Sequence, residues 1–126
     1  MNRKFGNTDL ITSPIVYGCM GGAGAFGAQE ETDSIKALQE AFNVGINFFD
    51  TAEAYGNGYS EQLLSRALGD KRSELVISSK VAAPNLAPDD VIEACERSLK
   101  NLGTDFIDLY MLHWPNRDVP LADSIG

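Results

Sequence analysis

The chain has 126 residues, of which 44% are hydrophobic and 22% are charged. The length is sufficient for one ordinary domain, and both percentages are typical of a globular protein. The net charge of −8 argues against nucleic acids and anionic membranes as partners, because both repel an acidic surface, but it leaves a small anionic ligand open.

The sequence carries no pattern typical of a membrane or secreted protein. No apolar run reaches the roughly 18 residues that a membrane span needs. The first six residues include two cations, but no apolar segment follows them, so we expect no signal peptide and a cytoplasmic protein. Cys19 and Cys95 are widely separated, so we expect reduced thiols and no metal site.

The N-terminal part predicts a hairpin, a strand and a glycine-rich loop. Residues 2–5 and 9–12 flank the turn-forming segment 6–8, which is typical of a short β-hairpin. Residues 15–17 form an expected strand that enters the glycine-rich stretch 18–24. The glycines of this stretch do not have the GxGxxG spacing, so the sequence does not predict a Rossmann dinucleotide site.

Helical and strand patterns then alternate along the chain. A first helix has apolar residues at helical spacing and ends at Gly45, and a second is expected to begin with Ser60 as its N-cap and to stop near Gly69. The other expected elements are strands 46–49, 75–79 and 106–112, a helix from Pro88 to Gly103 with Val91, Ile92 and a buried Cys95 on its apolar face, and the opening of a helix at 121–125.

The expected strands are nearly continuous apolar runs, as in parallel sheets that are covered on both faces. Together the patterns give one hairpin, four strands of the βα type and three complete helices. A βα barrel needs eight strands and typically about 250 residues. The sequence therefore predicts an α/β fold, about half of a (β/α)8 TIM barrel, as a single incomplete domain over residues 1–126.

Four polar residues stand at or just after the ends of these strands. Asp50 ends the run 45–50, Lys80 ends 75–80, His113 ends 106–113, and Tyr55 follows the first of these runs. The C-terminal ends of parallel strands are where a βα barrel carries its catalytic groups. An acid, a phenol, an ammonium and an imidazole that converge there can deliver a proton to a carbonyl oxygen, which points to carbonyl reduction.

Residues 45–56, Gly-Ile-Asn-Phe-Phe-Asp-Thr-Ala-Glu-Ala-Tyr-Gly, resemble the aldo-keto reductases. The resemblance continues through 60–61, 77–80, 98–105 and 108–115, so it covers essentially the whole chain. The chain is therefore similar to the N-terminal half of a member of that family. The resemblance implies an NADP-dependent oxidoreductase that reduces an aldehyde or ketone to an alcohol.

The resemblance also implies a role for each of the four residues. Tyr55 would donate the proton, Lys80 would supply the ammonium that favours its phenolate form, Asp50 would pair with Lys80, and His113 would orient the carbonyl. A free phenol has a pKa of about 10 and needs such a neighbour to be a good donor near neutrality. Taken singly, the same residues have plainer interpretations: a turn cap, a half-buried core tyrosine, an exposed lysine and a core imidazole.

By the same resemblance, the cofactor is NADPH, with NADH also open. Gly18, Cys19 and Met20, in the loop after the first βα strand, would contribute backbone contacts near the nicotinamide, together with Asp50; a merely flexible loop is the alternative. The substrate would be a small carbonyl compound.

Tyr55, His113 and Trp114 would bind the substrate, and Met20 would line the same mouth, although packing alone explains Trp114 and Met20 equally well. Glu61 is expected to be structural, in the first turn of its helix.

The resemblance places most cofactor contacts in a second half that this sequence does not contain. Four parallel strands also leave two open edges, which favour self-association or a partner that supplies the other half of the barrel. The alternatives are therefore an inactive truncated fragment, a non-enzymatic nicotinamide-binding or regulatory module, and a homodimer that rebuilds a closed barrel.

Overall fold

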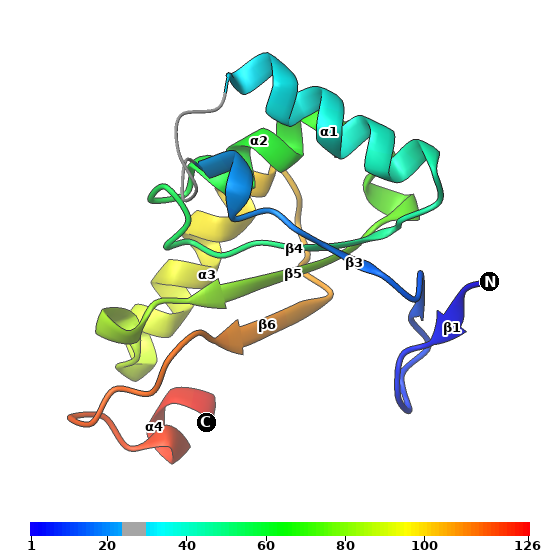
Figure 1. The fold of residues 1–126 in the computed structure, drawn as a ribbon. Coiled ribbons are helices and arrows are strands. Elements are labelled where there is room, and N and C mark those ends of the chain that lie inside the picture. Colours follow the sequence, from blue (N-terminus) through cyan, green and yellow to red (C-terminus); the bar gives the residue numbers. More distant parts are fainter. Residues whose placement is uncertain (24–29) are drawn as a thin grey trace.

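The computed structural model describes residues 1–23 and 30–126, and these form a small hairpin and a four-stranded parallel sheet covered by helices (Figure 1). Gly24, the last residue of the predicted glycine-rich stretch, lies outside the described residues. The strands are β1 Arg3–Lys4, β2 Ile11–Thr12, β3 Val16–Gly18, β4 Phe48–Asp50, β5 Val76–Val81 and β6 Leu109–Leu112. The helices are α1 Glu31–Asn43, α2 Tyr59–Leu68, α3 Pro88–Leu102 and α4 Leu121–Ile125, with short 3-10 helices at Gly21–Ala23, Gly69–Glu74 and Ala83–Asn85.

The sheet follows the order of the chain, β3-β4-β5-β6, and every neighbouring pair is parallel. Its register sets Gly18 opposite Asp50 and Asp50 opposite Ser78. The C-terminal ends of the strands therefore meet along one edge of the sheet, as the sequence predicted. In Figure 1 the arrowheads of β5 and β6 point the same way, and the hairpin lies at the other end of the sheet.

The predicted N-terminal hairpin is confirmed, since β1 and β2 pair antiparallel. Its turn is closed by Phe5 N–H donating to Leu10 O at 2.9 Å. The Phe5 ring meets Phe48 edge to face, with centroids 5.7 Å apart, and Asn47 Nδ2 donates to Ile11 O at 2.9 Å. The hairpin thus attaches to the end of the sheet where β4 begins, away from the predicted site.

The core lies between one face of the sheet and the helices. Side chains alternate along a strand, so Phe49 and Ile77 point into this core while Asp50 and Ser78 take the opposite face. The main buried cluster also contains Leu38 from α1 and further residues from α2 and α3. A smaller cluster formed by Val81, Leu86 and Ala94 packs under β6. Because the face of the sheet with Phe49 and Ile77 is buried under the helices, the side chains available for a site are those of the opposite face, such as Asp50 and Ser78.

All the predicted helix ends but one agree with the structure, including the end of α2 beside Gly69 and the start of α3 at Pro88. Gly45 and Gly103 follow α1 and α3 with φ values of +97° and +64°, as glycines at helix ends do. Ser60 is not the N-cap of α2: the cap is Gly58, with φ +87°, and a Cβ there would lie 2.5 Å from Asn101 Nδ2. Ser60 lies inside the helix, where its hydroxyl donates to Cys19 O at 3.1 Å.

The predicted strand 106–112 begins only at Leu109. Phe106 instead lies over the Arg72 guanidinium, 3.8 Å from ring centroid to Cζ, and Asp108 accepts hydrogen bonds from Arg72 and from Ile77 N–H. These side-chain contacts, together with Asp108 N–H donating to Ile77 O at 3.1 Å, hold the segment where the strand was expected to begin.

Three details of α3 and β5 also differ from the sequence prediction. Ile92 is 59% exposed, and Cys95 is half-buried rather than buried. Lys80 does not close its strand, because β5 continues to Val81.

In the described ranges, no helix is both long and apolar enough to cross a bilayer.

Candidate active site

Asp50 and Lys80 form an ion pair at the C-terminal end of the sheet. Lys80 Nζ lies 2.7 Å from Asp50 Oδ2 and also donates to Thr51 O at 2.8 Å. The other oxygen, Asp50 Oδ1, accepts the hydroxyl of Ser78 at 2.5 Å. Asp50 is opposite Ser78 in the sheet, and Lys80 comes two residues later on the same face, so strand register alone brings the three together.

Tyr55 lies in the turn between β4 and α2. Both polar groups of its backbone are hydrogen-bonded: Tyr55 N–H donates to Ala52 O at 3.1 Å, and Tyr55 O accepts from Ser60 N–H at 3.1 Å. Lys80 Nζ lies 5.1 Å from the centroid of the Tyr55 ring, within the range of a cation–π contact. The ammonium of Lys80 therefore lies against both the Asp50 carboxylate and the aromatic ring of Tyr55.

His113 follows β6 and completes the group. Its backbone N–H donates to Val81 O at 3.0 Å, and its ring meets Tyr55 edge to face with centroids 5.5 Å apart. Burial lowers the pKa of His113, the Lys80 charge lowers it further, and Asp50 acts in the opposite direction. Since the ordinary value is 6.5, the imidazole is neutral near pH 7 and keeps one N–H as a donor.

The structure thus brings the four predicted catalytic residues together from four places in the chain. Their assigned roles stay a prediction. The residues also include the carboxylate, ammonium, phenol and imidazole that proton delivery to a carbonyl oxygen requires. Among residues 1–23 and 30–126, no group of three or more metal-ligating side chains could hold an ion.

Gly18, the last residue of β3, and Cys19, the next residue, differ in how accessible they are to a ligand. Gly18 is exposed, and a Cβ built there would meet no atom within 4 Å. Cys19 is 4% exposed, and its N–H already donates to Asp50 O at 2.9 Å. Burial raises the pKa of the Cys19 thiol to about 12, helped by the Asp50 charge and opposed by Lys80. Gly18 is therefore the position of this loop best placed for a close approach by a ligand.

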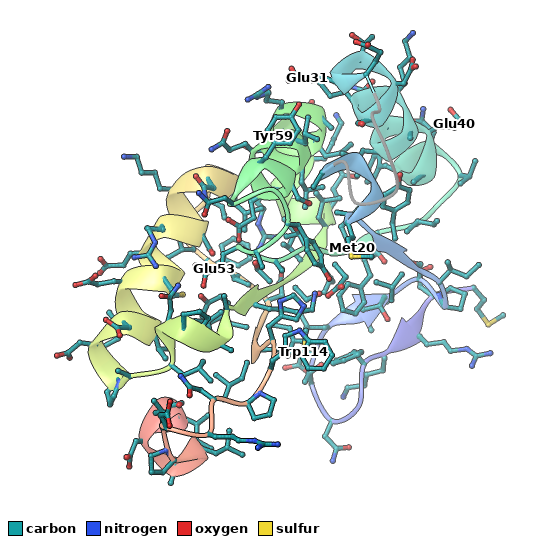
Figure 2. All side chains as sticks on the ribbon, turned by 60° about the vertical axis from the view of Figure 1, so that its left-hand side comes forward. Met20, Glu31, Glu40, Glu53, Tyr59 and Trp114 are labelled. Carbon is teal, nitrogen blue, oxygen red and sulfur yellow. The ribbon has the colours of Figure 1, made fainter. Side chains whose placement is uncertain are left out.

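Met20 and Trp114 come from the loops that follow β3 and β6 (Figure 2). Trp114 is 68% exposed and stacks on His113, with centroids 6.1 Å apart and 14° between the ring planes. Met20 is 37% exposed. Both present apolar surface beside the polar group, which fits the predicted substrate mouth without testing it.

Sequence reasoning missed several residues that contact the group, among them Ser78 and Glu53. Ser78 binds Asp50, and Glu53 N–H donates to Lys80 O at 3.2 Å, while its carboxylate accepts from the Ala82 N–H at 2.7 Å. Ser78 could have been found, because it precedes Lys80 by two residues in a strand and so shares its face. Glu53 gave no such signal, because its contacts depend on how two loops meet.

The model of the aldo/keto reductase family matches residues 14–126. The chain belongs to this family. Among curated aldo/keto reductase relatives, the aldo-keto reductase YhdN of Bacillus subtilis is 34% identical over 82% of this chain and 34% of its own length. The methylglyoxal reductase YeaE of Escherichia coli is 38% identical over 69% of this chain and 31% of its own length. The chain therefore spans about a third of the length of these relatives.

Solved aldo-keto reductase structures give the same result. The thermostable aldo-keto reductase Tm1743 superposes with a TM-score of 0.87 at 34% identity, over 98% of this chain and 46% of that one. An aldo-keto reductase from Klebsiella pneumoniae in complex with NADPH gives 0.82 at 30% identity, over 91% of this chain and 39% of that one. The predicted fold is confirmed: these strands and helices are the first half of an aldo-keto reductase barrel.

Proposed function

We propose that the protein reduces an aldehyde or ketone to an alcohol with NADPH as the hydride donor. The observation that carries this proposal is the position of Lys80, whose ammonium is 2.7 Å from Asp50 and 5.1 Å from the centroid of the Tyr55 ring. His113 lies against the same ring. Family membership supports the reaction class, and the NADPH complex of the Klebsiella pneumoniae relative supports the cofactor.

The residues present fit the nicotinamide end of such a cofactor. Gly18 lies opposite Asp50 in the sheet, and space around its Cα position allows a flat ring to approach the backbone. Met20 and Asp50 would flank that ring. When bound, the cofactor supplies a hydride to the carbonyl carbon. NADH is the competing donor that any assay has to include.

In the proposed reaction the side chains supply the proton and its control. The Tyr55 hydroxyl gives its proton to the carbonyl oxygen. The Lys80 ammonium stabilises the phenolate that remains, because an adjacent positive charge favours the charged form of a phenol. Asp50 keeps the ammonium in place, and the neutral His113 donates a hydrogen bond that orients and polarises the carbonyl.

The proposal is tested by following NADPH consumption with a panel of small aldehydes and ketones. The assay uses the chain itself and the chain joined to the remaining barrel strands of a relative, because this chain spans about a third of its curated relatives. We expect carbonyl-dependent consumption that Tyr55→Phe removes. Equal consumption with and without carbonyl, or by the Tyr55→Phe variant, contradicts the proposal.

A second candidate is a nicotinamide-binding module that regulates another protein without turnover. It is favoured by one relative from Oryza sativa subsp. japonica, named "Probable voltage-gated potassium channel subunit beta", which is 31% identical over 98% of this chain. Binding and turnover separate the two candidates. Saturable cofactor binding without carbonyl-dependent consumption by either version supports the regulatory function.

The protein's partners are also proposals. The substrate is a small carbonyl compound that contacts Tyr55, His113 and Trp114. The outer edges of β3 and β6 pair with no other strand among the described residues. These edges are suited to a second copy of the chain or to strands that complete the barrel.

A further inference from the structure

Glu53 opens the turn that carries Tyr55, and its carboxylate reaches the loop that follows Lys80. Glu53 Oε1 accepts the Ala82 N–H at 2.7 Å and the side-chain amide of Asn85 at 2.8 Å. The Glu53 side chain is only 13% exposed. Figure 2 shows Glu53 beside α3, where Arg97 Nη2 lies 3.6 Å from its other oxygen.

The backbone of Glu53 makes the same connection. Its N–H donates to Lys80 O at 3.2 Å, and its carbonyl accepts from Gly58 N–H at 2.7 Å. Glu53 is thus bonded to the strand that carries Lys80, to the loop after that strand and to the end of the Tyr55 turn. Each of these bonds joins segments that are distant in sequence or closes the turn itself.

The turn after Tyr55 is made of residues with wide conformational freedom. Gly56, Asn57 and Gly58 follow Tyr55 with φ values of +64°, +53° and +87°. Glycine, and to a lesser degree asparagine, adopts these values readily but is free to adopt many others. Local preference therefore does not select one conformation, and contacts from outside the turn decide where Tyr55 lies.

We propose that Glu53 is a positioning residue that sets Tyr55 against Lys80 and His113. The inference rests on the proposed function, because it assigns Glu53 to the reaction of that site. Hydrogen bonds rather than charge carry the effect. The two bonds to Oε1 are short and shielded, whereas Arg97 is 52% exposed and 3.6 Å away, so solvent screens that pair.

The chain has one histidine, and this gives a direct readout of where Tyr55 lies. His113 meets the Tyr55 ring edge to face at 5.5 Å, so the ring current of Tyr55 shifts the His113 proton resonances. Glu53→Ala is compared with Glu53→Gln, which keeps an acceptor oxygen for Ala82 and Asn85. Glu93→Ala is the matched control, because Glu93 also pairs with Arg97, at 3.9 Å, but is 70% exposed.

We expect Glu53→Ala to move the His113 resonances toward their positions in a Tyr55→Leu reference, while Glu53→Gln and Glu93→Ala keep the wild-type spectrum. In the reductase assay, kcat of Glu53→Ala falls roughly 10- to 100-fold with a smaller change in KM, as a misplaced catalytic group predicts. Glu53→Gln restores kcat. If Glu53→Ala unfolds, Glu53→Met replaces it, since it keeps side-chain bulk without an acceptor oxygen.

Wild-type His113 resonances in folded Glu53→Ala or Glu53→Met overturn the inference, and so does a loss in Glu53→Gln equal to that in Glu53→Ala. The spectra do not depend on turnover. A wild-type protein that consumes no cofactor therefore contradicts the proposed function alone, and the His113 comparison still decides whether Glu53 positions Tyr55.

Discussion

The rings of Tyr55 and His113 meet edge to face, with their centroids 5.5 Å apart and their planes at 80°. Tyr55 belongs to the turn after β4 and His113 to the end of β6, and β5 with Lys80 lies between those strands. The contact therefore forms only when three strands are in register. Variants at this site test chemistry and sheet assembly together, so each needs a control that separates the two.

Tyr55→Phe removes the hydroxyl and keeps the ring. We expect kcat to fall roughly 10²- to 10⁴-fold, the usual contribution of a general acid, while the thermal midpoint stays near that of the wild type. Steady-state NADPH consumption and a melting curve measure the two effects. Tyr59→Phe is the control, because its hydroxyl bonds Glu31, outside the proposed site, and its rate should match the wild type. Near wild-type kcat in Tyr55→Phe excludes Tyr55 as the proton donor.

Lys80→Met removes the ammonium and leaves the Asp50 carboxylate with the Ser78 hydroxyl alone. The Lys80 side chain is 13% exposed and the Asp50 side chain is 28% exposed. The loss should therefore lie between that of a surface pair and that of a fully buried one, roughly 1–3 kcal/mol. Urea unfolding measures it. Adding Asp50→Asn should recover part of the stability but none of the activity, and a double variant no more stable than Lys80→Met shows that the pair is not coupled.

His113 should make stability depend on pH. Burial and Lys80 lower its pKa in the folded chain below the ordinary 6.5 of the unfolded chain. Between these two values the unfolded state binds more protons, so the free energy of unfolding rises with pH through that window and levels off above it. The free energy of unfolding of the wild type and of His113→Gln, measured at several pH values, isolates the contribution of His113 to this pH dependence.

The same group can be followed directly, because a single histidine gives unambiguous NMR signals. Lys80→Met should raise the pKa of His113, and Asp50→Asn should lower it, since these two charges act on it in opposite directions. Titration curves that do not move in either variant show that His113 does not sense the ion pair.

The sequence predicted the fold and the four clustered residues because both depend on pattern. Apolar runs fix the strands, and parallel strands place whatever follows them at one edge. The sequence prediction failed where a side chain has more than one possible hydrogen-bond partner. Ser60 looked like an N-cap, but its hydroxyl bonds Cys19 O and Thr51 inside the fold, and Gly58 takes the cap because Asn101 leaves no space for a Cβ.

The contacts between loops could not be predicted from the sequence either. Phe106 reads as the start of a strand, yet it covers Arg72, whose position depends on the segment before β5. The Glu53 bonds to Ala82 and Asn85 likewise need the packed structure before they can be recognised. Such contacts are set by tertiary packing, which local preference does not encode.

Cys19 should be the less reactive of the two cysteines. Burial raises its thiol pKa to about 12, so almost none is thiolate near neutrality, whereas Cys95 is only half-buried, although burial raises its pKa as well. We expect a thiol-alkylating reagent to modify Cys95 first in the native protein and Cys19 only in denaturant, as read by peptide mass. Equal native rates contradict the buried position of Cys19.

The isolated 126-residue chain should bind NADPH weakly and should not remain a uniform monomer. The outer edges of β3 and β6 are unpaired among the described residues, and Val16 in β3 is 45% exposed. Unpaired edges and apolar surface favour association with other chains. The proposed contacts at Gly18 and Asp50 would serve only one end of the cofactor, so affinity should be low. Sedimentation and a cofactor fluorescence titration measure both properties, with the version that carries the remaining barrel strands as the control. A monodisperse monomer with micromolar NADPH affinity contradicts this expectation, and a discrete dimer that binds NADPH supports a barrel completed by two copies.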